Sequence, residues 1–182
     1  EVFPLFESRP DQVALVFPDD RVRMTATAMQ FINADHNVVD PELTALFTDA
    51  LREAGFVFPA RLVGGNFTIL KPYDDGVFIV DANNSVFHVR RVNGQPLVVR
   101  TPMAQSLAPR HILMAESSRQ GFRGLILGND NTLYLLPADS YDLIALPREL
   151  PGTGGLTHTG TGGLAHTGTG GLAHTGTGGL TH

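Results

Sequence analysis

The C-terminal segment repeats one octapeptide, and this repeat limits the conformations that the segment can adopt. Gly-Leu-(Thr/Ala)-His-Thr-Gly-Thr-Gly starts at Gly155 and runs through three copies and a final half copy to His182. The period is even, so in an extended chain each residue type returns to the same face in every copy. In an α-helix the repeat would drift by roughly 80° per copy, and each glycine would cost about 1 kcal/mol relative to alanine. The repeat therefore predicts an extended segment.

The two faces of such a segment differ in their chemistry. One face is rich in threonine, which is typical of O-glycosylated stalks, and the other carries leucine and histidine, through which copies of the tail would stack. The candidate glycosylation sites are Thr157, Thr159, Thr161, Thr167, Thr169, Thr175 and Thr177. The candidate assembly face consists of Leu156, His158, Leu164, His166, Leu172, His174 and Leu180.

An isolated strand of this composition would not stay ordered in water, because glycine loses much entropy and one leucine per eight residues buries little apolar surface. Neighbouring chains or copies could supply the missing backbone partners, so we expect a fibre or stacked assembly. Consecutive histidines would lie about 26 Å apart along one strand, too far to share a metal ion. A passive Gly/Thr linker, a repeat expansion of a truncated gene and an added affinity segment are the alternatives.

Charge and composition separate the tail from the rest of the chain. No charged residue follows Glu149, so we expect a domain over residues 1–150 and a tail over 151–182. A net charge of −5 does not favour nucleic acid or an anionic membrane surface. The chain has no cysteine, which excludes disulfides and thiolate metal sites, and its apolar runs are too short to span a membrane. No cofactor is predicted.

The first 150 residues read as mostly β-structure with one helix. The helix is expected near residues 41–54, because Asp40 can cap it, Pro41 suits its first position and Gly55 can end it. Asn83-Asn84 and Asn93-Gly94 are hairpin signals. Alternating apolar residues predict strands over residues 12–17, 21–26, 67–70, 77–81, 86–91, 96–99, 112–116, 124–127, 132–136 and 141–146.

Two stretches of the domain resemble each other. Residues 78–89 (FIVDANNSVFHV) align with residues 125–136 (LILGNDNTLYLL) at a spacing of 47, which is close to the spacing of propeller blades. Two blades cannot close a propeller. The expected fold class is therefore α+β and mostly β, as a partial propeller-like set of antiparallel hairpins, a smaller sheet with one helix, or a unit completed by another chain.

Four segments resemble an uncharacterised bacterial family with a domain of unknown function. They are residues 4–9 (PLFESR), 31–35 (FINAD), 54–61 (AGFVFPAR) and 92–96 (VNGQP). The resemblance implies the periplasmic, propeller-like part of a membrane-anchored protein that is often encoded beside ABC-transporter genes. It implies no known activity and no functional residue. We expect the chain to depart from this family in lacking the anchor, and it carries octapeptides after Pro147.

Candidate chemistry in the domain is better explained by turns and capping. This holds for the cluster of Asp35, His36 and Asp40, and for the oxygen-rich segments at 74–76 and 129–131, which lack the ligand number of a calcium loop. Ser117-Ser118 lack the context of a catalytic nucleophile, and Arg90-Arg91 read as the solvent side of a strand. We therefore predict no catalytic residue and no metal site.

These observations predict a structural protein of the bacterial cell surface, extracellular or periplasmic, that self-associates through its repeat tail and carries glycans on threonine. The alternative is a periplasmic accessory or ligand-binding module of an ABC transporter, with the tail as a linker and a permease as partner. An enzyme, a hydrolase with loop carboxylates such as Asp35, is the third interpretation.

Overall fold

The computed structural model describes residues 2–8, 14–117 and 121–148. These residues fall within one compact unit, Glu1–Glu149. The octapeptide tail lies outside the described residues, and so do all the candidate glycosylation and assembly residues that the sequence predicts there.

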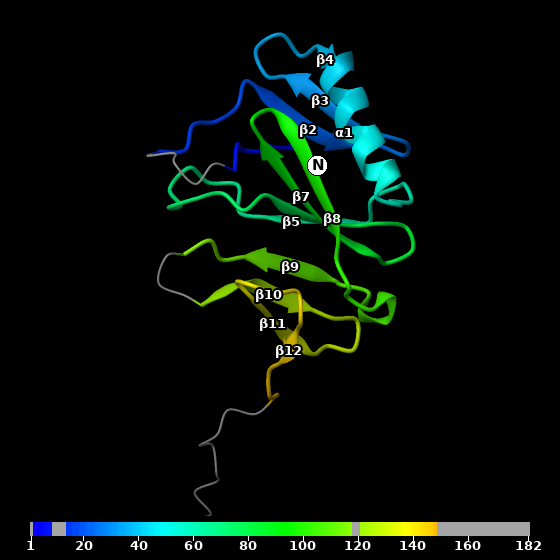
Figure 1. The fold of residues 1–182 in the computed structure, drawn as a ribbon, viewed down its shortest axis with the longest axis vertical. Helices are drawn as coiled ribbons and strands as arrows, with labels where there is room; N and C mark the ends of the chain where they lie inside the picture. The colour runs from blue at the N-terminus through cyan, green and yellow to red at the C-terminus, as the bar shows by residue number, and fades with distance from the viewer. Residues whose placement is uncertain (1, 9–13, 118–120, 149–182) are drawn as a thin grey trace, which may run out of the picture. The chain divides into compact units, whose positions relative to one another are not determined.

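The described chain forms three antiparallel sheets, each with four strands that neighbour one another in sequence order (Figure 1). Sheet A consists of β1 (Val2–Phe3), β2 (Asp20–Met24), β3 (Met29–Asn33) and β4 (Val39–Asp40). Sheet B consists of β5 (Leu62–Gly65), β6 (Val77–Val80), β7 (Val86–Val92) and β8 (Gln95–Arg100). Sheet C consists of β9 (His111–Met114), β10 (Phe122–Leu127), β11 (Leu133–Pro137) and β12 (Ile144–Ala145). A 3-10 turn, η1 (Gln105–Leu107), lies between β8 and β9.

The helix α1 (Pro41–Glu53) begins and ends at the residues that the sequence indicates. The Asp40 side chain accepts a hydrogen bond from the backbone N–H of Leu43, and Pro41 occupies the first turn, where its missing N–H costs nothing. Gly55 follows the helix with a φ of +86°, a conformation that favours glycine. The helix packs on sheet A, where the Thr44 hydroxyl accepts a hydrogen bond from the N–H of Phe31 in β3.

Sheet B is the central layer, and both of its faces are buried. Side chains alternate along a strand, so Val77 and Ile79 of β6 join one apolar core while Phe78 and Val80 join another. The first core lies between sheet B and the layer formed by sheet A and α1, and the second lies between sheets B and C. Figure 1 shows the resulting order of layers, with β5–β8 between the other two sheets.

The expected mostly-β fold with one helix is confirmed, and so is the position of the helix. The expected turns are confirmed as well, because Asn84, Asn93 and Asn131 all have positive φ values. The similarity between residues 78–89 and 125–136 corresponds to the β6–β7 and β10–β11 hairpins. The described residues give no support to the propeller part of the expectation, because their three sheets pack as layers, with one apolar core on each face of sheet B.

Several strand predictions were wrong in detail. Residues 67–70 form no strand, because the chain loops there so that the carbonyl of Asn66 can accept a hydrogen bond from the side chain of Lys71. Residues 14–17 are also irregular, and the expected strand over 141–146 is limited to β12. The sequence pattern missed β1, β3, β4 and β5.

Candidate functional site

The chain's single lysine is buried in a cluster of charged side chains between sheets B and C. Lys71 lies in the loop that connects β5 to β6, and its Nζ donates to Asp74 Oδ1 (2.6 Å), Glu116 Oε2 (2.6 Å) and the carbonyl oxygen of Asn66 (2.7 Å). These three bonds use all the N–H donors of an ammonium group. The side chains of Lys71 and Asp74 are 2% exposed and that of Glu116 is 0% exposed. We call Lys71, Asp74 and Glu116 the lysine cluster.

Both carboxylates of the lysine cluster are fully hydrogen bonded. Asp74 Oδ2 accepts from the Ser8 hydroxyl (2.6 Å) and from the Gly76 N–H (2.9 Å), while Glu116 Oε1 accepts from the Asp75 N–H (2.7 Å). The cluster therefore joins three distant pieces of chain, namely the N-terminal segment, the β5–β6 loop and the residues after β9. A cavity of about 610 Å³ adjoins Lys71 and Glu116. Because the polar side-chain atoms of Lys71 and Glu116 already have hydrogen-bond partners, the lysine cluster has little capacity to bind a ligand in this cavity.

Burial sets the protonation of Glu116. Loss of solvation raises the pKa of its carboxyl to about 7, and the hydrogen bonds from Asp75 N–H and Lys71 oppose that rise. Two carboxylates share one ammonium in this cluster, so a proton on Glu116 would leave one charge of each sign. The cluster is thus one part of the described domain whose charge can change near neutral pH.

A second polar group is centred on His88 in β7. The His88 ring stacks on Phe78, with centroids 4.4 Å apart, and lies below the surface with 1% exposure. Its Nε2 contacts the Asp75 carbonyl oxygen, which can only accept, so Nε2 carries the proton and Nδ1 accepts from the Tyr141 hydroxyl (2.9 Å). Burial lowers the pKa of His88, which favours this neutral form.

The Asp75 side chain links this group to the arginines. Its Oδ2 lies 2.6 Å from Arg123 Nε, and its Oδ1 lies 3.7 Å from Arg90 Nη1. Arg123 in turn covers the Tyr141 ring, with its guanidinium carbon 5.1 Å from the ring centroid. Polar contacts therefore continue from the lysine cluster through Asp75 to Tyr141.

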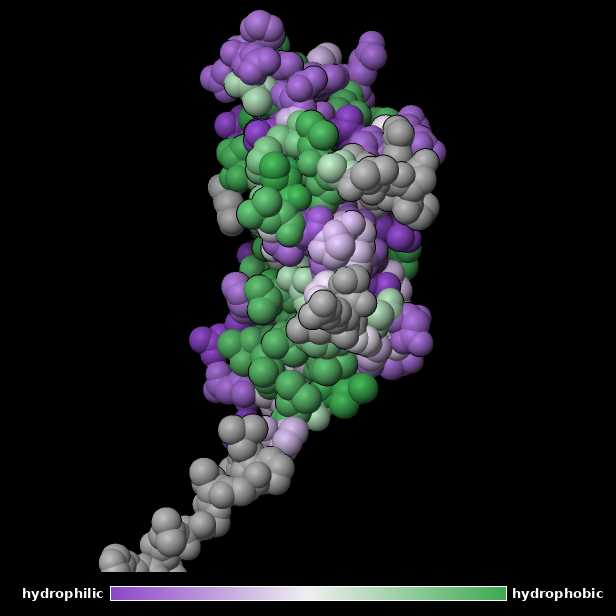
Figure 2. Space-filling model, turned by 90° about the vertical axis from the view of Figure 1, so that its left-hand side faces the viewer, coloured by the Kyte–Doolittle hydropathy of each residue, from purple (hydrophilic) through white to green (hydrophobic). Residues whose placement is uncertain are grey.

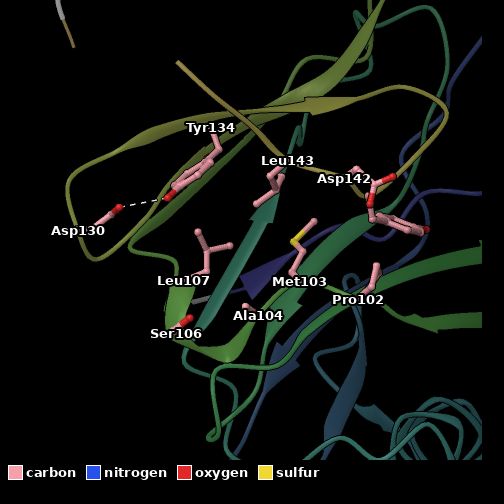
Figure 3. A pocket seen from close by; sticks show the side chains of 10 residues that line it. Pro102, Met103, Ala104, Ser106, Leu107, Asp130, Tyr134, Asp142 and Leu143 are labelled. Atoms are coloured by element: carbon pink, nitrogen blue, oxygen red, sulfur yellow. Dashed lines mark hydrogen bonds between the residues drawn. The ribbon is translucent and has the colours of Figure 1, made fainter. Parts of the chain in front are cut away.

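Tyr141 also borders a cavity of about 400 Å³ beside sheet C (Figure 3). The cavity lies between the segment around η1, the β10–β11 turn and the chain before β12. Within it, the Tyr134 hydroxyl donates to Asp130 Oδ2 (3.1 Å). Its wall is formed by Pro102, Met103, Ala104, Ser106, Leu107, Asp130, Tyr134, Tyr141, Asp142 and Leu143.

The structure separates the polar residues that the sequence singled out. Asp35 and His36 lie in a turn, where their N–H groups donate to Asn33 Oδ1, and Asp40 caps α1. Within the described residues, no group of three or more His, Asp or Glu side chains could hold a metal ion. Asp130 is a turn residue that also borders the cavity.

Two interpretations from sequence need correction. Asp74 and Asp75 are more than turn residues, because both take part in buried or half-buried ion pairs. Arg91 is not a solvent-facing residue, since its side chain is only 15% exposed and its Nη1 lies 2.8 Å from Asp20 Oδ2. Arg90, at 33% exposure, is half-buried beside Asp75.

Sequence reasoning missed Lys71 and Glu116. One signal could have drawn attention to the first: twelve of the thirteen Lys and Arg residues are arginine, so Lys71 is the only lysine. No local pattern distinguishes Glu116, because its burial depends on residues distant in sequence.

Comparisons with known proteins give one match. The model of a family described as "Domain of unknown function (DUF4857)" matches residues 1–151. No curated protein and no solved structure matches the chain. In the part of the chain that the structure describes, no helix is long and apolar enough to cross a membrane.

Proposed function

The chain belongs to this family of unknown function, and we propose that it is a non-catalytic assembly protein whose domain pairs with a second copy through the outer face of sheet C. The observation that supports this proposal is a row of aliphatic side chains on the face of sheet C that points away from sheet B.

Strand register places the aliphatic side chains side by side. Leu113, Leu125, Leu135 and Ile144 pair directly across β9, β10, β11 and β12, so they share one face of the sheet. Residues two positions along a strand return to that face, which adds a second directly paired set. The aliphatic side chains of the outer face are those of Leu113, Leu125, Leu127, Leu133, Leu135 and Ile144, and His111, which pairs with Leu127, lies on the same face.

The two faces of sheet C differ in exposure. Ile112 and Ile126, on the inner face, are 3% and 0% exposed, whereas Leu113 and Ile144 on the outer face are 52% and 55% exposed. Figure 2 shows apolar side chains gathered at the height of this sheet. Large contiguous apolar areas are uncommon on proteins that act alone and usually mark an interaction surface.

A second copy fits this surface well. The inner faces of the sheets in this domain already pack on one another through aliphatic and aromatic side chains. An outer face of the same composition can pack on its own image across a two-fold axis, because leucine against leucine is self-complementary. Covering each half-exposed leucine would contribute on the order of 1 kcal/mol at about 25 cal/mol per Å².

The test is the oligomeric state of the full chain, measured by sedimentation velocity over a range of concentrations. We expect a dimer or larger assembly that Leu113→Glu together with Ile144→Glu converts to a smaller species. Val38→Glu is the matched control, because Val38 is 61% exposed on the turn before β4 and lies outside this face. A monomeric wild-type protein, or loss of assembly in the control variant, would contradict the proposal.

The repeat tail adds a second route to assembly. We propose that its Leu and His face stacks into a fibre and that its threonines carry glycans, on the strength of the repeat pattern alone. Deleting residues 152–182 separates the two routes: loss of filaments with retention of dimers assigns the filaments to the tail and the dimers to sheet C. Loss of every assembly after that deletion would remove the role proposed for sheet C.

The location follows from the resemblance noted in the sequence. We propose a bacterial cell-envelope location. The alternative role that we propose for such a domain is that of an accessory module of an ABC transporter. Fractionation of source cells, followed by co-purification with a permease, would test both statements. Recovery of the chain from the cytoplasm would contradict them.

A further inference from the structure

We propose that the cavity beside sheet C binds a linear alkyl diamine, a cation with an amine at each end of an apolar body. This inference goes beyond the proposed assembly and does not depend on it. It is based on the shape of the cavity, the chemistry of its wall and the positions of its two carboxylates. The cavity has a volume of about 400 Å³, which is in the range of small-molecule sites.

The middle of the cavity is apolar. Met103, Leu107 and Leu143 lie between its two ends in Figure 3, and Met103 is only 8% exposed. The rings of Tyr134 and Tyr141 complete the wall. An alkyl chain would exclude water from these side chains, and aromatic faces attract ammonium groups.

The two ends of the cavity are acidic. Figure 3 shows Asp130 at one end and Asp142 at the other, and none of the described residues that line the cavity is basic. Asp130 accepts hydrogen bonds from Thr132 N–H and from the Tyr134 hydroxyl, and these bonds lower its pKa and keep it ionised. Among the described residues, no hydrogen bond to the Asp142 carboxylate is seen. A carboxylate at each end matches a ligand with a cation at each end.

Two arginines near the cavity wall already form hydrogen bonds or ion pairs with other groups of the protein. Arg123 pairs with Asp75 through Nε and donates to the Ala138 carbonyl oxygen through Nη2. Arg148 donates to the backbone carbonyl oxygen of Asp130 and not to its carboxylate. Both arginines would repel a cation in part, so we expect a diamine to bind more tightly than a monoamine, which can reach only one carboxylate at a time.

The experiment is a titration of the full chain with 1,5-diaminopentane, followed by isothermal calorimetry and by ¹⁵N-resolved NMR shifts. 1-Aminopentane and pentane-1,5-diol are the ligand controls, because each lacks one or both of the ammonium groups. We expect saturable binding of the diamine with affinity roughly tenfold or more above that of the monoamine, and no binding of the diol.

Variants then assign the site. Asp142→Asn should weaken diamine binding roughly tenfold without unfolding the protein, because no contact of the Asp142 carboxylate with the described chain is lost. Asp139→Asn is the matched control, since Asp139 is an exposed carboxylate on the same connection that does not line the cavity. Equal binding of monoamine and diamine, an equal effect of the control variant, or no saturation would overturn the proposal.

Discussion

The Nζ atom of Lys71 lies 2.6 Å from Oε2 of Glu116, although the two residues are 45 positions apart in sequence. This contact joins the loop before β6 of sheet B to the second residue after β9 of sheet C. Both side chains are almost completely buried. A charge at such a depth is stable only while its partner and its hydrogen bonds are present, so the pair constrains how the two sheets meet.

Replacement of the buried ammonium should strongly destabilise the described domain. Lys71→Met keeps much of the side-chain volume but leaves Asp74 and Glu116 facing each other without a cation. We expect a loss of about 3–5 kcal/mol in the free energy of unfolding. Urea denaturation followed by circular dichroism measures this loss. Arg110→Met, at an exposed arginine, is the control, and a similar effect of both changes would contradict the structural role of Lys71.

The raised pKa of Glu116 predicts a pH-dependent stability. Its folded pKa, about 7, lies above its ordinary value of 4.5, so the folded chain holds this proton more tightly than the unfolded chain does. The resulting stabilisation is fully present below pH 4.5 and is lost as pH rises through 7, by on the order of 3 kcal/mol. Glu116→Gln should remove this dependence.

The contribution of His88 to the pH dependence of stability has the opposite sign to that of Glu116. The effect of Glu116 must therefore be measured as a difference between two proteins. Burial lowers the pKa of His88, and its contribution is present above pH 6.5 and lost as pH falls. Both proteins retain His88, so subtracting the stability of Glu116→Gln from that of the wild type isolates the carboxyl. A flat difference between pH 4.5 and 7.5 would show that the carboxyl keeps an ordinary pKa.

Labelling of the single lysine offers a test of burial. Lys71 Nζ has three acceptors and almost no exposure, so an amine-reactive ester should modify it only when the surrounding structure opens. We expect modification roughly tenfold or more slower than in a short lysine peptide in the same solution, and equal rates in 6 M guanidinium chloride. Mass spectrometry of the peptide that contains Lys71 gives the rate. Equal rates in native buffer would show that the lysine cluster is open.

Local signals in the sequence predicted local structure well. Asp40, Pro41 and Gly55 act within one turn of α1, and asparagine at positions 84 and 131 supplies the positive φ that the hairpin turns need. These features depend on neighbouring residues only, so they can be recognised without knowledge of the fold.

Features that depend on distant residues were missed. Gly64 and Gly65 weaken the strand signal of β5, yet sheet C requires a small residue at position 64. The sequence pattern predicts a strand and a turn over residues 66–76. These residues instead form a loop that holds Lys71 beside Glu116, which is distant in sequence. The cavity beside sheet C combines residues from 102–107, 130–134 and 141–143, and no single motif contains them.

The close approach of sheets B and C at Gly64 gives the last prediction. A Cβ atom at this position would overlap the side chain and the carbonyl oxygen of Ile112 in β9. Because backbone as well as side chain is in the way, Gly64→Ala should destabilise the domain by about 1–3 kcal/mol. Gly121→Ala is the matched control, since a Cβ there meets no atom within 4 Å. Its stability should stay within about 0.5 kcal/mol of the wild type.

Urea unfolding of both glycine variants makes this comparison, with thermal melting as a second readout. If Gly64→Ala and Gly121→Ala lose the same stability, β5 and β9 do not pack closely. The second apolar core would then lack the contact between Ile112 and sheet B. If Gly64→Ala alone is destabilised, Ile112→Val in the same chain should recover none of the loss, because valine keeps the Cβ and Cγ2 atoms that the new Cβ would overlap. A recovery of stability by this second change would contradict the assignment of the clash to the Cβ, Cγ2 and carbonyl oxygen of Ile112.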